Sequence, residues 1–136
     1  MTDLTVTAAS VRPLPGCVIR RFTAGGTINV GSPVYLSSNS TIGAADGSTI
    51  TQVWAIGVLA ATNPNAASQV AAASGDACDV VLFGPVAGYT CVANTVYYVD
   101  DDAGVIADAA GTKDCIIGIG LDTTTLLVRP QLVDLS

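Results

Sequence analysis

The side chains that could perform acid–base or nucleophilic chemistry are few in this sequence. It has no histidine, and Lys113 is its only lysine. Without an imidazole the usual proton shuttle at neutral pH is missing, so neither a Ser-His-Asp nor a Cys-His arrangement can be assembled. A Ser-Lys pair would need Lys113, which lies in the turn-like stretch Ala110–Asp114 and is expected to be exposed. We therefore expect that the protein is not an enzyme.

Carboxylates are the remaining candidates for chemistry, and all eleven acidic residues are aspartates. The densest run is Asp100–Asp102, which Ala103 and Gly104 follow. Clustered carboxylate oxygens suit a hard cation, but the spacing does not match an EF-hand loop. A polar turn between Val99 and Val105 is the favoured interpretation, and cation binding is the alternative. We expect no cofactor and no bound metal.

The four cysteines are Cys17, Cys78, Cys91 and Cys115. They show no C-x-x-C spacing, and no histidine accompanies them, so a zinc site has almost nothing to build on. We interpret them as small buried hydrophobic residues in a reducing compartment. A disulfide formed later, outside the cell, is the alternative.

The charge content favours contact with other proteins. Charged residues make up 12% of the 136-residue chain and apolar residues 50%, whereas about 25% charged residues is ordinary. Such a surface is expected to be buried in part against partners. The net charge of −6 disfavours binding to nucleic acid and to anionic membranes.

Membrane and export signals are not found in the sequence. No apolar run is long enough to cross a bilayer, and the N-terminus lacks the basic and then apolar layout of a signal peptide. We therefore expect synthesis in the host cytoplasm.

The periodicity of the chain predicts an all-β fold. Val, Ile and Thr are abundant, Glu is absent, and short apolar runs alternate with Gly-containing turns, a pattern typical of a sandwich or barrel. The predicted strands are Cys17–Phe22, Thr27–Val30, Pro33–Leu36, Thr41–Ala44, Val53–Leu59, Ala77–Phe83, Tyr89–Val92, Thr95–Val99, Val105–Ala107, Cys115–Leu121 and Thr125–Arg129.

One segment departs from this pattern. Asn63 could cap a helix that has Pro64 at its first position, and Gly75 could end it. The sequence therefore predicts at most one short helix, with an irregular connection as the alternative.

An internal repeat divides the chain into two similar β-units. A shift of 62 residues places Val34-Tyr35 on Val96-Tyr97, and a shift of 61 places Ile56-Gly57-Val58 on Ile117-Gly118-Ile119. We predict one β domain over residues 17–136, with repeats at approximately 17–62 and 79–124. Neither repeat is expected to fold alone, because a few short strands cannot bury a core.

Residues 1–16 are predicted as an N-terminal arm or a first strand. Apolar and polar residues alternate weakly there, so the arm could add a strand to a partner or belong to the domain. Arg12 lies in this segment, Arg20 and Arg21 follow it, and all three could face an acidic surface. The predicted partner contacts are Leu4, Val6, Val11, Arg12, Arg20 and Arg21.

Three stretches resemble the capsid decoration (cement) proteins of tailed bacteriophages. Gly31–Leu36 resembles their G-x-x-V-Y strand, Ala55–Leu59 their A-x-G-I strand, and Gly75–Gly84 their G-D/E-x-V-x-V strand, with one extra residue before its valines. The resemblance covers approximately residues 17–129. These motifs are structural, and the family pattern contains no catalytic residue to carry over.

The resemblance implies a small β-barrel or β-tulip-like domain and a structural role. Such a protein binds the major capsid protein on the outer surface of the virion as a homo-oligomer, usually a trimer, and stabilises the capsid by bridging neighbouring subunits. This sequence departs from the family in its duplication and in its near absence of Glu and Lys. The alternative function is a fibre or adhesin module that recognises a host-surface glycan through Trp54 and tyrosines.

Overall fold

The computed structural model describes residues 3–61 and 71–134. The fold is all-β, as predicted. The only helical element in these residues is a 3-10 turn, η1 (Ala8–Ser10). The predicted helix at residues 63–75 falls mostly outside the described residues; within them, Ala71–Ala72 is a strand.

The strands are β1 (Thr5–Val6), β2 (Arg12–Pro13), β3 (Val18–Ala24), β4 (Ile28–Asn29), β5 (Pro33–Ser38), β6 (Thr41–Ala44), β7 (Gly57–Ala61), β8 (Ala71–Ala72), β9 (Ala77–Ala87), β10 (Tyr89–Thr90), β11 (Val96–Val99), β12 (Ile106–Ala107), β13 (Asp114–Gly120) and β14 (Thr125–Asp134).

Five strands within residues 18–87 close into a barrel. Their order is β9-β3-β6-β5-β7, and β7 pairs with β9 to complete the circle. Only the β3–β6 pair is parallel. Valine and isoleucine fill the interior because alternate strand residues point inward. Val34, Ile42 and Val80 are fully buried there.

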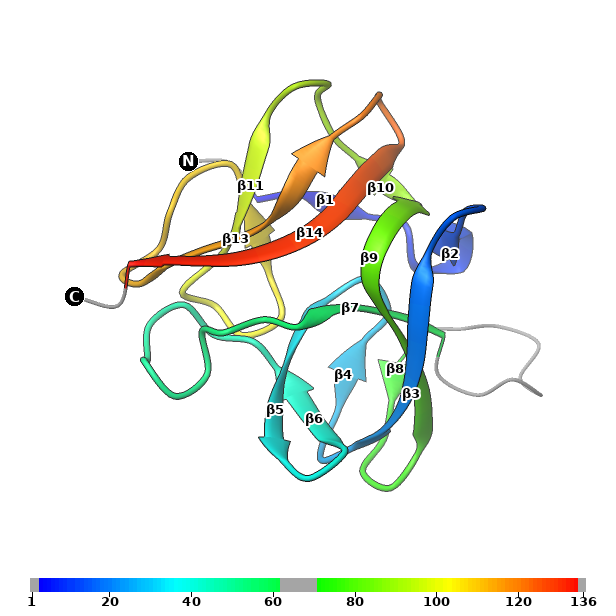
Figure 1. Cartoon of the computed structure of the whole chain (residues 1–136), viewed down its shortest axis with the longest axis vertical. Helices are drawn as coiled ribbons and strands as arrows, with labels where there is room; N and C mark the ends of the chain where they lie inside the picture. Colours follow the sequence, from blue (N-terminus) through cyan, green and yellow to red (C-terminus); the bar gives the residue numbers. More distant parts are fainter. Residues whose placement is uncertain (1–2, 62–70, 135–136) are drawn as a thin grey trace.

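The second half of the chain repeats these pairings but leaves its sheet open. The β11–β12, β11–β13 and β13–β14 pairs correspond to β5–β6, β5–β7 and β7–β9. In the second unit the place of β3 is taken by the C-terminal half of β9, which pairs with β14. In Figure 1, β9 runs from the lower barrel into the upper sheet and joins the two units.

The bend in β9 lies at Gly84. The sequence predicts a strand ending at Phe83, but β9 continues to Ala87. Gly84 has a φ of +128°, and a Cβ there would lie 2.7 Å from the Cα of Cys17. A glycine allows this conformation and this close approach, so the strand bends instead of ending.

The predicted strand Val53–Leu59 is wrong in its first half. Regular pairing begins only at Gly57. Val53 and Ala55 are nonetheless buried, and the Ile56 amide donates to the Val34 carbonyl at 2.9 Å. Residues 53–56 do not join the ladder, and Trp54 lies on the surface between the buried Val53 and Ala55.

Candidate protein-contact surface

An apolar groove on the barrel is the candidate functional site. Two adjoining hollows of about 380 and 400 Å³ share Leu36, Trp54 and Ile56 in their walls. We call them together the Trp54 groove. Its lining residues are Arg20, Phe22, Tyr35, Leu36, Ile50, Thr51, Trp54, Ala55, Ile56, Leu82 and Pro130.

The exposure of Trp54 follows from local backbone geometry. Successive side chains of an extended segment point to opposite sides. Val53 and Ala55 are buried in the core, so the indole between them faces solvent and is 63% exposed. Leu36 and Ile50 are 49% and 55% exposed. An exposed tryptophan among exposed aliphatic side chains is typical of a surface that another protein covers.

The connection between β6 and β7 holds Ile50 and Trp54 in place. The Asp46 amide donates to the Gln52 carbonyl at 3.0 Å and closes the loop. The Ser48 amide and hydroxyl both donate to Asp46 Oδ1, at 2.9 and 2.6 Å. Gly47 donates its amide to the Asp100 carbonyl at 2.7 Å and anchors the loop to the second unit. The groove is therefore carried by a hydrogen-bonded loop over a packed barrel.

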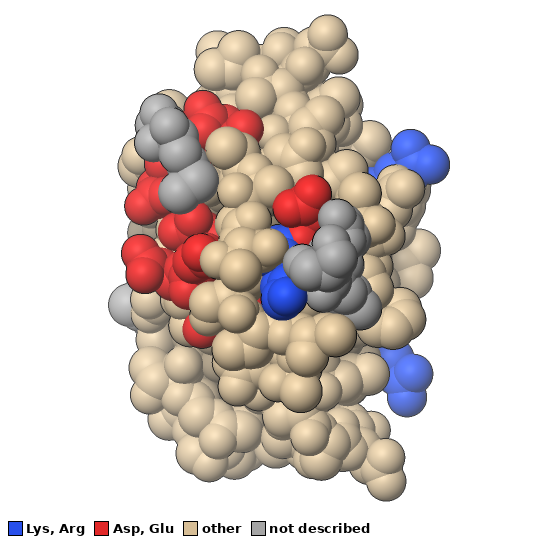
Figure 2. Space-filling view, turned by 90° about the vertical axis from the view of Figure 1, so that its left-hand side faces the viewer, with Lys and Arg blue, Asp and Glu red and all other residues tan. Residues whose placement is uncertain are grey.

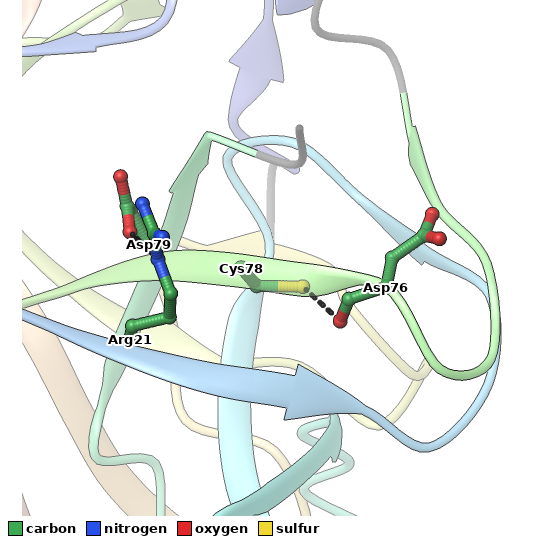
Figure 3. A network of polar contacts seen from close by, with 4 residues as sticks. All are labelled: Arg21, Asp76, Cys78 and Asp79. Carbon is green, nitrogen blue, oxygen red and sulfur yellow. Dashed lines mark hydrogen bonds and ion pairs between the residues drawn. The ribbon is translucent and has the colours of Figure 1, made fainter. Parts of the chain in front are cut away.

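One arginine, Arg20, lines this groove, and two others lie on different surfaces. The guanidinium of Arg20 lies over the Phe22 ring, 5.4 Å from its centroid, and Arg20 also lines the groove. Arg21 points to the other side of β3 and forms an ion pair with Asp79, Nε to Oδ1 at 3.1 Å (Figure 3). Arg129 lines a smaller hollow of about 160 Å³ on β11, β13 and β14. No aspartate lines the Trp54 groove or this hollow among the described residues.

Acidic residues gather elsewhere. Figure 2 shows most acidic side chains of one face along its left side, a further acidic group beside a basic side chain near its centre, and other basic side chains at the right edge. The connection between β11 and β13, which includes β12, carries four aspartates, Asp100, Asp101, Asp102 and Asp108, and Asp114 begins β13. The distribution therefore separates an acidic loop region from an apolar surface that carries arginine.

The run Asp100–Asp102 forms a turn. Asp101 accepts hydrogen bonds from the amide and hydroxyl of Thr112, both at 2.7 Å, and these bonds lower the pKa of its carboxyl group. Asp100 is 3% exposed, and its Oδ1 has no hydrogen-bond partner in the described part of the chain. The described residues contain no group of three or more metal-ligating side chains. Cation binding stays the alternative prediction.

All four cysteines are free thiols. Cys78, Cys91 and Cys115 are buried, whereas Cys17 is partly exposed. Burial raises the pKa of each thiol above its usual value. Their protonated state and their packing agree with a role as small apolar side chains.

The six predicted contact residues are not gathered on one surface. Leu4 and Val11 are buried in the chain's own core, and Val6 is half-buried. Arg12, Arg20 and Arg21 are exposed. A contact role for all six stays a prediction, and the three arginines are the members that a partner can reach.

Sequence reasoning missed the groove residues Leu36, Ile50 and Trp54 as contacts. It assigned Val53–Leu59 to a strand and gave Trp54 a role only in glycan recognition. One signal in the sequence could have indicated an exposed Trp54. In an extended segment, if the small or branched residues Val53 and Ala55 face the core, the tryptophan between them faces solvent. Pro130 comes to the groove from the far end of the chain, and its place could not be read from spacing.

The sequence matches no protein-family model, and no curated protein is significantly similar to it. No helix in the described residues is both long and apolar enough to span a membrane.

Proposed function

We propose that the chain is a structural virion protein that binds the outer surface of a bacteriophage capsid and stabilises it by bridging neighbouring capsid subunits. The partner is the major capsid protein, and the chain acts as a homo-oligomer, with a trimer favoured. The exposed Trp54 groove is the observation that carries this proposal. It supplies contact area, and it presents no constellation of reactive groups.

The chemistry of the groove favours a protein partner. Its walls are aliphatic and aromatic, with Arg20 beside them. Buried tryptophan and arginine contribute most to many protein interfaces. A capsid surface that offers an apolar side chain next to a carboxylate would fill the groove and pair with the guanidinium. Many copies bound to one shell would add their contributions.

The glycan-binding alternative draws on the same tryptophan. An exposed indole can stack on a sugar ring, but sugar recognition also needs several polar groups that fix hydroxyls. The side chains of the groove offer few of these, namely the hydroxyls of Thr51 and Tyr35 and the guanidinium of Arg20. Binding to a glycan array by the isolated protein would favour this alternative.

The proposal is tested by co-sedimentation of the purified chain with capsids assembled from the major capsid protein of the same phage. We expect saturable binding at a fixed ratio to capsid subunits and a higher melting temperature of the decorated shells. Light scattering after size exclusion gives the oligomeric state of the free protein. Chains that stay in the supernatant at every capsid concentration would refute the proposal.

A further inference from the structure

The described residues before β2 cross the second unit as an arm, which we define as residues 3–11. The Leu4 amide donates to the Ile106 carbonyl at 2.7 Å, and the Thr7 amide donates to the Gly88 carbonyl at 2.8 Å. Between these two bonds β1 pairs with β10. Leu4 and Val11 are 9% and 7% exposed. The arm therefore consists of the strand β1 and two buried side chains, Leu4 and Val11, which anchor it to the rest of the fold.

The surface beneath the arm is shaped to receive it. We call this surface the arm socket and define it as residues 29–31, 88–90 and 104–107. Gly31 and Gly88 have φ values of +90° and +108°. A Cβ on Gly31 would lie 2.5 Å from Val6 Cγ1, and one on Gly88 would lie 2.6 Å from Val11 Cα. Because glycine has no Cβ, these two positions leave room for Val6 and Val11 of the arm to lie against the socket.

The second unit takes this strand from a distant part of the chain. In the first unit β4 pairs with β8, which directly precedes β9. In the second unit the corresponding strand β10 pairs with β1. The place beside β10 is therefore filled by a strand from outside the second unit. The same contacts could be made by β1 of another copy.

The arm is held by limited contact. Its ladder is two residues long. A cavity of about 300 Å³ remains between Leu4, Val6 and Ala8 on the arm and residues of the socket. A two-residue ladder contributes little by itself, so the arm depends on its buried anchors Leu4 and Val11, and exchange would re-form these contacts in the other copy.

The connection to β3 suits an exchange. It runs through Pro13, Leu14, Pro15 and Gly16. The two prolines restrict φ to extended values, and Gly16, with a φ of +98°, has open space around its Cβ position. A change of direction at Gly16 would carry the arm outward together with β2. The β2–β9 pairing and the buried positions of Leu4 and Val11 would then be re-formed in another copy.

We propose that the arm is an exchangeable strand, and that the arm socket of one copy binds the arm of a second copy of this chain. Exchange replaces each contact by the same contact with another chain, so only the connection changes, and association costs little. The link between copies would be a strand and two apolar anchors, Leu4 and Val11. This inference does not depend on capsid binding, because it concerns the protein in solution.

The test traps the exchanged arm with a disulfide. Thr5 and Thr90 are paired across β1 and β10, and both are exposed. Directly opposed strand residues lie close to the Cβ separation that a disulfide needs. One chain carries Thr5→Cys and the other Thr90→Cys, and both carry Cys17→Ser to remove the partly exposed thiol. The two chains are mixed, incubated and oxidised mildly, and mixed dimers are counted by mass spectrometry.

The control replaces Thr90→Cys with Ser74→Cys, which is exposed in the turn between β8 and β9. We expect the Thr5→Cys and Thr90→Cys pair to give at least about tenfold more mixed dimer, because docked partners have effective concentrations near the millimolar range. A double variant with both changes in one chain shows that the pair can be oxidised. Equal yields from the test and control mixtures would overturn the proposal.

A second variant gives an independent answer. Deletion of Leu14 and Pro15 shortens the connection so that the arm cannot reach its own socket. We expect this variant to form a folded oligomer at a size that light scattering resolves, because a short connection favours exchange. A folded monomer, or a chain that no longer folds at any concentration, would also overturn the proposal.

Discussion

Two glycines hold equivalent places in the two units, and each lies close against the backbone of a neighbouring strand. Gly57 in β7 lies against the carbonyl of Val81, and Gly118 in β13 lies against the carbonyl of Leu127. Gly57 begins β7 and Gly118 lies within β13. The pairing register of β7 with β9 and of β13 with β14 shifts along the strand. A side chain at either position would collide with backbone, which cannot rotate away. Single residues therefore set how tightly neighbouring strands pack.

Replacing either glycine with alanine should destabilise the fold strongly. We expect Gly57→Ala and Gly118→Ala each to lower the free energy of unfolding by about 3 kcal/mol, the upper end of the cost of overpacking. Gly26→Ala is the matched control, because nothing lies within 4 Å of its Cβ position. Urea unfolding followed by tryptophan fluorescence measures all three, and equal midpoints would contradict the packing account.

The buried thiols predict a loss of stability at alkaline pH. Burial raises the pKa of Cys78, Cys91 and Cys115 in the folded chain above the unfolded value, for which 9.0 is the reference. The folded state therefore favours the neutral thiol, and its stabilising contribution is complete below pH 9 and is lost as pH rises above it. Burial raises the pKa of Tyr89 in the same direction.

The measurement is the urea midpoint between pH 7 and pH 10.5. We expect a constant midpoint near neutrality and a decrease above about pH 9. At pH 8, a thiol reagent should modify Cys17 before the three buried cysteines. A midpoint that rises with pH, or reaction of Cys115 ahead of Cys17, would be inconsistent with this reading of burial.

At the scale of elements, the N-terminal arm belongs to the folded domain. Its anchors Leu4 and Val11 join the hydrophobic cluster, and β2 pairs with the end of β9. The sequence left open whether this segment is an arm or a first strand. In the structure it contains a short strand, a 3-10 turn and a second short strand. Removal of the arm should therefore affect stability as well as any contact with a partner.

The arm prediction compares two neighbouring residues. Leu4→Ala should cost about 2–3 kcal/mol of unfolding free energy, because it removes a buried side chain and leaves a cavity. Thr5→Ala on the same strand is exposed and should change stability by less than about 0.5 kcal/mol. Thermal unfolding at one protein concentration distinguishes them. A Leu4→Ala protein as stable as Thr5→Ala would show that the arm is not anchored as described.

Much of the fold could be predicted from periodicity. Thr41–Ala44 is a strand with the predicted bounds, and the β11 and β13 strands differ by a residue or so at their ends. Local pattern could not show that β9 continues through Gly84-Pro85, because this pair ordinarily ends a strand and only its neighbours stabilise the bend. It also could not show which distant strands pair, because closure of the barrel depends on contacts far apart in sequence.

The candidate site was harder to predict than the fold. The arginines were proposed as contacts because charged residues are rare in this chain and three of its four arginines lie near one end, and their contact role stays a prediction. Leu36 and Ile50 were not found, because an isolated apolar residue carries no sign of whether it faces the core or the solvent. The groove appears only when β3, β5, β9 and β14 come together around Trp54.

At the scale of the whole molecule, the apolar groove is separate from the aspartate-rich connection between β11 and β13. The Trp54 groove and Arg20 lie on the first barrel, whereas the aspartate-rich loop lies in the second unit. Partners of negative potential would be drawn to the first and repelled by the second, so the molecule has a preferred orientation as it approaches an acidic surface. Exposed ion pairs such as Arg21 with Asp79 add little to stability.

The central claim is that function rests on contact through the Trp54 groove, and the affinity of one variant for capsids tests it most directly. Trp54→Ala removes the exposed indole, and Leu121→Ala is its control, since Leu121 is 47% exposed beyond the groove lining. We expect Trp54→Ala to weaken capsid binding at least about tenfold, as loss of a central tryptophan typically does, while Leu121→Ala binds like the wild type. Equal affinities for folded Trp54→Ala and wild-type protein would contradict the account.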